Sequence, residues 1–188
     1  MTVKTVLRIG DPLLNQVSQR VSDPDSAAIR RLIEDMFDTM HACEGAGLAA
    51  PQIGVLSRVV IFGLDHNSRY PDAEAVPKTV LINPEIEILS TEFVSDWEGC
   101  LSVPGMRGLV PRSKKIRYSG VDQLGEKIER TVSGFHARVV LHECDHLDGI
   151  IYTQRIKDLK DFGFIEELLQ SGRYNPVPCD SEEGSISE

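Results

Sequence analysis

Two histidines four residues apart, His142 and His146, place the strongest constraint on how this chain folds. At about 100° per residue, a helix brings the second side chain back to within roughly 40° of the first, so both imidazoles can bind one metal ion. Glu143 is then the natural base for a metal-bound water. Cys144 lies on the far side of such a helix and is a poor ligand. The motif therefore predicts a helix that carries a metal site.

Length and composition favour one globular domain with a sizeable core. The chain has 188 residues, 41% of them hydrophobic, and no apolar run approaches the length that spans a bilayer. The N-terminus shows neither a signal segment nor a transit segment, so we expect a cytoplasmic protein with reduced cysteines and no membrane contact. A net charge of −9 argues against sequence-specific binding of nucleic acid, because phosphate contacts require clustered Lys and Arg.

Hydrophobic periodicity and turn residues predict a small set of helices and strands. Helical spacing after the capping residues 23–26 predicts an amphipathic helix at 25–42, and the metal motif lies on a predicted helix at 135–146. Strand patterns occur at 58–62, 79–82 and 85–89, and a hairpin is expected from 115–121 and 127–132. A last amphipathic segment covers 159–169 and predicts a C-terminal helix.

This order of elements predicts an α+β fold with a mixed or antiparallel sheet wrapped around the metal-binding helix. It is not the alternating order of a βαβ protein. We expect a single catalytic domain at 1–170. The segment 171–188 is acidic and poor in apolar residues towards its end, and it is predicted to be a disordered tail.

A catalytic metal site usually has three protein ligands, and the two histidines supply only two of them. The sequence contains two candidates for the third ligand. Cys100 lies among turn-forming and polar residues just after a predicted strand. Glu166 or Glu167, about twenty residues after the motif, would instead suit a zinc peptidase. The spacing alone leaves both alternatives open.

Three motifs in order carry a resemblance to a known family. They are Gly45-Ala-Gly-Leu-Ala-Ala-Pro-Gln52, Glu98-Gly-Cys-Leu-Ser102 and His142-Glu-Cys-Asp-His146. Together they resemble the peptide deformylases, metalloenzymes that remove the N-formyl group from newly made proteins, and the likeness runs from Leu7 to Gly149. The resemblance implies hydrolysis of N-formyl-methionyl peptides with release of formate. The other readings are the zinc endopeptidase and a protein that binds formylated N-termini without turnover.

The resemblance also implies a ligand set and a metal. The ligands would be Cys100, His142 and His146, and a Cys/His₂ set leaves the fourth position open for water or substrate. Ferrous iron is implied as the native metal, with zinc, nickel or cobalt able to replace it. By softness alone, the ligand set suits zinc at least as well.

The same resemblance assigns catalytic roles. Glu143 would take a proton from the water and return it to the departing amine. The Gln52 side-chain amide and the Leu101 backbone N–H would stabilise the developing oxyanion.

Further residues are expected to bind substrate or to hold the site in register. Glycines permit the close approach of a peptide that pairs like an added strand. Arg138 is expected to line the methionine pocket with its stem while its head stays in water. The expected substrate-binding residues are Gly45, Ala46, Gly47, Leu48, Gly99, Arg107, Phe135, Arg138 and Val139, and the expected supporting residues are Glu98, Asp145 and Arg112.

A transient contact with the ribosome is expected as well, because the substrate would be a newly made chain. The acidic C-terminal end does not suit docking through a basic C-terminal helix. The patch Lys114, Lys115 and Arg117 is the substitute that the sequence offers.

Overall fold

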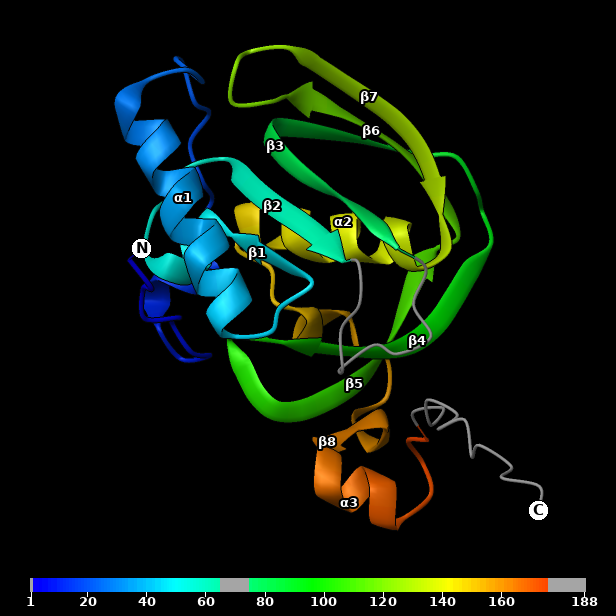
Figure 1. The fold of residues 1–188 in the computed structure, drawn as a ribbon. Helices are drawn as coiled ribbons and strands as arrows, with labels where there is room; N and C mark the ends of the chain where they lie inside the picture. Colours follow the sequence, from blue (N-terminus) through cyan, green and yellow to red (C-terminus); the bar gives the residue numbers. More distant parts are fainter. Residues whose placement is uncertain (1, 65–74, 176–188) are drawn as a thin grey trace, which may run out of the picture.

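The computed structural model describes residues 2–64 and 75–175 and shows two antiparallel sheets with a helix between them (Figure 1). Most of the predicted tail lies outside these residues. The elements are α1 (Ala27–Ala42), β1 (Gly47–Ala49), β2 (Val59–Leu64), β3 (Val76–Ile88), β4 (Phe93–Cys100), β5 (Val103–Ser113), β6 (Lys115–Val121), β7 (Lys127–Ser133), α2 (Gly134–Leu147), β8 (Phe162–Phe164) and α3 (Ile165–Gln170).

The two sheets enclose the helix that carries the histidine motif. One sheet has the order β1-β2-β3-β6-β7 and the other β4-β5-β8, and neighbouring strands in both are antiparallel. Helix α2 contacts strands of both sheets, while α1 packs on the outer side of the larger one (Figure 1). The predicted α+β fold, with antiparallel strands around the helix of the histidine motif, is confirmed. None of the described helices has the length and apolar character needed to span a bilayer.

Burial on both faces of β2 fixes the larger sheet between the two helices. Val60 and Phe62 belong to the core that includes α2, whereas Val59 and Ile61 belong to the core that includes α1. Successive side chains of a strand point to opposite faces, so this continuous apolar run serves two cores at once. Each fully buried aliphatic side chain contributes about 1.5–3 kcal/mol. The sheet is therefore held by packing from both sides.

The segments predicted as separate strands at 79–82 and 85–89 form one long strand, β3. Its pairing is irregular between Ile82 and Glu85, where Asn83 has a φ of 52°. The Asn83 side chain accepts from the N–H of Val21 at 2.8 Å and donates to its carbonyl at 2.9 Å. Asn tolerates this conformation, and Pro84 next to it removes a donor. The Asn-Pro pair therefore bends the strand without ending it.

Strand β5 was not predicted, because Pro104, Gly105 and Pro111 interrupt its pattern, and β4 was predicted only as a strand of unstated length before Cys100. The last predicted helix, 159–169, is also shorter than expected. Leu159–Asp161 forms one turn of 3₁₀ helix, Phe162–Phe164 forms β8, and only Ile165–Gln170 is α-helical. Residues 171–175 continue from α3, with the N–H of Ser171 bonded to the carbonyl of Glu167 at 3.0 Å.

Gly149 fixes the end of α2 against the N-terminal segment. Its φ is +71°, and an added Cβ would lie 2.6 Å from the backbone of Asn15. We expect Gly149→Ala to lower the free energy of unfolding by more than about 2 kcal/mol, because backbone cannot move aside cheaply. Gly125, with a φ of +79° and no neighbour within 4 Å, is the matched control. Gly125→Ala should cost only about 1 kcal/mol in urea unfolding; equal losses would contradict the close contact.

Candidate metal centre

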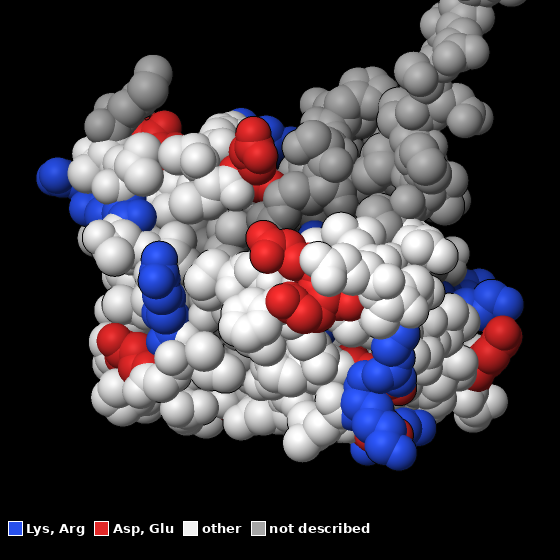
Figure 2. Space-filling view, turned by 90° about the horizontal axis from the view of Figure 1, so that it is seen from below, with Lys and Arg blue, Asp and Glu red and all other residues white. Residues whose placement is uncertain are grey.

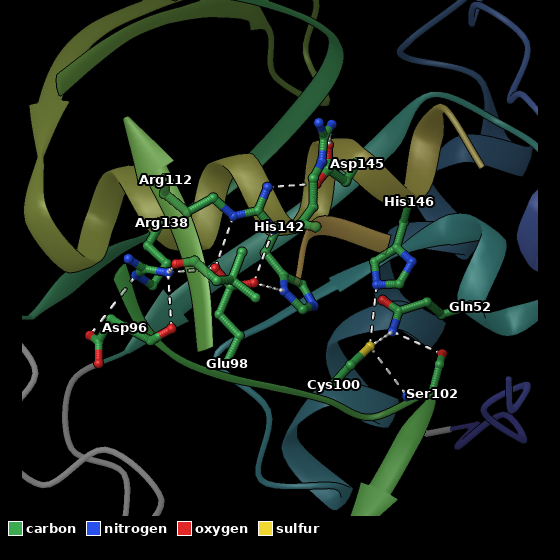
Figure 3. Close-up of polar contacts among 12 residues, drawn as sticks. Gln52, Asp96, Glu98, Cys100, Ser102, Arg112, Arg138, His142, Asp145 and His146 are labelled. Atoms are coloured by element: carbon green, nitrogen blue, oxygen red, sulfur yellow. Dashed lines mark hydrogen bonds and ion pairs between the residues drawn. The ribbon is translucent and has the colours of Figure 1, made fainter. Parts of the chain in front are cut away.

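Helix α2 and the end of β4 bring three metal-ligating side chains together (Figure 3). His142 and His146 lie on one face of α2, with ring centroids 5.2 Å apart. Cys100 is the last residue of β4, and its Sγ lies 3.3 Å from His146 Nε2. The ligand atoms of the three residues are all within 4.8 Å of one another, and all three residues are buried. This Cys/His₂ arrangement fits a divalent cation of zinc or iron type.

The structure decides between the two candidates for the third ligand. Glu166 and Glu167 lie exposed on α3 and are not part of the ligand cluster among the described residues. Cys100 is part of it. The zinc endopeptidase reading therefore lacks its third ligand in this fold.

Glu98 orients the first histidine. Its Oε2 accepts from Nδ1 of His142 at 2.9 Å, which leaves Nε2 free to face a metal ion. Arg112 donates to both oxygens of Glu98, each at 2.9 Å, and Arg138 donates to Oε1 at 2.7 Å. Burial raises the pKa of Glu98, but the hydrogen bonds and charges of Arg112 and His142 outweigh it and hold the pKa far below its usual value. Glu98 is therefore an ionised acceptor.

The buried arginines extend this contact into a network between the sheets and α2 (Figure 3). Arg112 also donates to Asp145 at 2.5 Å, so it pairs with both acids among the expected supporting residues, Glu98 and Asp145. Arg138 donates to the carbonyls of Val94 at 2.7 Å and Val110 at 2.8 Å. The prediction that the Arg138 head stays in water was wrong. Its charge is neutralised by Glu98, and these carbonyls replace its hydration.

The Cys100 sulfur is surrounded by donors. Gln52 Nε2 and the N–H of Ser102 each lie 3.4 Å from Sγ. Burial raises the pKa of the Cys100 thiol, but the charge of His146 and hydrogen bonds from His142 and His146 lower it well below its usual value overall. The thiolate is the metal-binding form, so this environment prepares Cys100 as a ligand.

The Gln52 amide has a fixed orientation. Its Oε1 accepts from the N–H of Ala49 at 2.8 Å, which turns Nε2 towards Cys100 and the cleft. Nε2 also donates to the Ser102 hydroxyl at 3.1 Å. Ser102 was not among the predicted site residues, although its hydroxyl two positions after Cys100 was the available signal.

Glu143 lies directly against Gly47. A Cβ on Gly47 would be 2.5 Å from Glu143 Oε1, so only glycine fits there. Oε2 of Glu143 is buried and has no hydrogen-bond partner among the described residues. Burial raises the pKa of Glu143 to about 7, against the opposing effect of His142 and His146. A carboxylate with this pKa can both accept and release a proton near neutral pH.

The candidate ligands Cys100 and His142 line a cleft between two sheet edges. Within residues 2–64 and 75–175, β1 pairs only with β2 and β4 only with β5, so each has an edge that no described strand covers. Helix α2 forms the floor between these edges. The lining residues are Gly45, Ala46, Gly47, Gln52, Trp97, Glu98, Gly99, Cys100, Leu101, Phe135, Arg138, Val139, His142 and Glu143.

Two predicted substrate-binding residues lie elsewhere. Leu48 is fully buried in the core with α1, because it alternates with Gly47 and points to the opposite face of β1. Arg107 is buried on β5, and its guanidinium lies where a Cβ of Gly99 would be. Neither lines the cleft. The other predicted substrate-binding residues do.

Known proteins resemble this chain over most of its length. The model of the polypeptide deformylase family matches residues 3–162. Peptide deformylase 1 of Nitrosomonas europaea is 59% identical over 89% of this chain and 95% of the relative. A Met-Ala-Ser-bound class I type b peptide deformylase from Acinetobacter baumannii has a TM-score of 0.79 and 39% identity, covering 82% of this chain and 99% of that one. A peptide deformylase from Ehrlichia chaffeensis has a TM-score of 0.77 and 31% identity, covering 93% and 99%.

Glu98→Gln tests the role of the buried carboxylate. We expect it to weaken Zn²⁺ or Ni²⁺ binding by about 10- to 100-fold, because His142 loses its charged acceptor. The affinity is measured by competition with a coloured chelator on protein shown to be folded by circular dichroism. Glu87→Gln is the matched control, since Glu87 pairs with Arg117 at the surface and its loss changes the net charge equally. Unchanged affinity in Glu98→Gln would refute this role.

Proposed function

This chain belongs to the polypeptide deformylase family, and we propose how its cleft carries out the family's reaction. The protein is a metal-dependent hydrolase that removes the formyl group from N-formyl-methionyl peptides and releases formate. The convergence of Cys100, His142 and His146 beside Glu143 is the observation that carries the residue assignment.

We propose that Cys100, His142 and His146 hold the cation and that Glu143 handles the proton. A divalent cation, once bound, supplies an activated water by lowering the pKa of that water from about 16 to about 7. Glu143 accepts the proton through the oxygen that lacks a partner, and its raised pKa lets it return that proton to the amine of methionine. Water thus adds across the formyl C–N bond, and the products are formate and the free amine of methionine.

Gln52 and Leu101 are proposed to stabilise the negative charge on the formyl oxygen. The amide of Gln52 lines the cleft, and the bond from the N–H of Ala49 to its Oε1 fixes the side of the amide from which Nε2 would donate. Leu101 lines the cleft directly after Cys100, and its backbone N–H is the second proposed donor. Each such donor typically contributes about 10²- to 10³-fold in rate.

The substrate is proposed to bind as an extended strand between the edges of β1 and β4. Gly45 and Gly47 allow a peptide backbone to approach, and Phe135, Val139 and the stem of Arg138 line the floor where the methionine side chain would lie. The related structure from Acinetobacter baumannii is bound to Met-Ala-Ser. A bound peptide that begins with methionine supports the proposed class of substrate.

We further propose ferrous iron as the native metal, a cytoplasmic location and a transient contact with the ribosome, where formylated N-termini emerge. The basic patch offers little support for that contact, because Lys114 pairs with Glu92 and Arg117 with Glu87. Helix α3 carries two acids and no basic residue. On the face shown in Figure 2, the Lys and Arg side chains lie in separate groups with acidic groups among them.

Formate release from formyl-Met-Ala-Ser tests the reaction. Protein loaded with Fe²⁺ or Ni²⁺ should release one formate per peptide, whereas Glu143→Ala should lose at least about 10²-fold in kcat while keeping its metal, because it lacks the base. Formate is measured with a coupled formate dehydrogenase. Metal-loaded protein that releases no formate would overturn the proposal.

Gly47→Ala tests the placement of Glu143. The added methyl group displaces the carboxylate, and we expect kcat to fall by about 10²-fold with the metal retained. Gly163→Ala is the control glycine substitution, since an added Cβ there would lie 3.5 Å from the Leu168 side chain, an ordinary contact, and Gly163 lies outside the cleft lining. A fully active Gly47→Ala variant would show that Glu143 is not held against this glycine.

A further inference from the structure

The chain beyond α3 returns to the mouth of the cleft. Trp97 is half-buried on β4 and lines the cleft, and its ring centroid lies 5.6 Å from that of Tyr174 at an angle of 61°. Tyr174 is held in place by its N–H, which donates to the carbonyl of Leu168 at 3.1 Å. Figure 1 shows β8 and α3 below the smaller sheet, with the following residues turning back towards it. An edge-to-face aromatic pair thus stands at the rim.

The spacing along β4 places this pair beside a particular part of the substrate. Cys100 and Trp97 are three residues apart on the strand, which corresponds to about 10 Å. A peptide extended along the same edge covers that distance with about three residues. With the formyl group at Cys100, the residues that follow methionine lie beside Trp97.

The alternation of side chains along β4 leaves the Trp97 ring, and with it the Trp97–Tyr174 pair, accessible to a ligand. Glu98 and Cys100 are buried towards α2, whereas Trp97 and Gly99 alternate with them and are only half-buried. The guanidinium of Arg107 fills the space where a side chain of Gly99 would lie, and Trp97 and Gly99 both line the cleft. The aromatic surface is therefore continuous with the cleft.

We propose that Trp97 and Tyr174 form a specificity site for a substrate residue after formyl-methionine and favour an aromatic or large apolar side chain there. This inference rests on the proposed function. Tyr174 acts both by contact and by holding the Trp97 ring, so the C-terminal segment takes part in substrate selection. An aromatic contact of this kind changes a rate constant by about 3- to 10-fold.

The test compares peptides that differ only after methionine. For each enzyme, kcat/KM is measured for formyl-Met-Ala-Ala, formyl-Met-Phe-Ala and formyl-Met-Ala-Phe by formate release. The wild-type protein should favour one of the two phenylalanine peptides over the alanine peptide by about 3- to 10-fold. In Tyr174→Ala and Trp97→Leu this ratio should fall to about 1, whereas Tyr174→Phe should keep it. A merely structural defect would lower the rates for all three peptides together and leave the ratio unchanged.

Phe164→Leu is the matched control. Phe164 is 58% exposed, lies in the same C-terminal part of the chain and is not among the residues that line the cleft. It should keep the wild-type ratio. A wild-type ratio near 1, or a ratio that survives in both Tyr174→Ala and Trp97→Leu, overturns the inference. Failure of wild-type protein to release formate from any of the three peptides would instead overturn the proposed function.

Discussion

The buried carboxylate of Glu98 is the contact on which the rest of the site depends. It accepts hydrogen bonds from Arg112 on β5 and from Arg138 and His142 on α2, so one side chain joins a strand, its neighbour and the central helix. Removing one partner would leave an uncompensated charge in a buried position, which typically costs about 3–5 kcal/mol. Cys100 follows Glu98 by two residues on the same strand. The contacts that hold Glu98 beside His142 therefore also fix the position of the Cys100 sulfur relative to α2.

Charge balance explains why so many ions can be buried here. Glu98 and Asp145 face Arg112 and Arg138, and Arg155 adds a contact to Asp145 at 2.6 Å from its partly exposed position. The backbone carbonyls of Val94 and Val110 complete the hydrogen bonding of Arg138. The network is therefore nearly neutral and well satisfied, as a buried polar cluster has to be. Its members come from segments far apart in the sequence.

Local patterns predicted those parts of the protein that local physics determines. The helix at 25–42, the hairpin and the metal helix follow from spacing within single segments, and the structure confirms them. The residues proposed as ligands followed from two histidines on one helix face and from the resemblance that singled out Cys100. The head of Arg138 was misplaced because its partner Glu98 is 40 residues away. Leu48 was misplaced because the side of β1 on which it lies is determined by α1. Strand β5 was missed because its prolines and glycines interrupt the strand pattern, whereas the strand is held by pairing with β4.

The cleft has walls that belong to different sheets, and this limits what can enter it. Its width is set by the packing of α2 between those sheets, since the helix contacts both of them. With the proposed binding of substrate as an added strand, this cleft would accept a single extended chain and exclude a folded N-terminus, whose backbone groups are already paired. On this architecture, a protein would be processed only while its first residues are unstructured. Folding of its N-terminus would prevent the reaction.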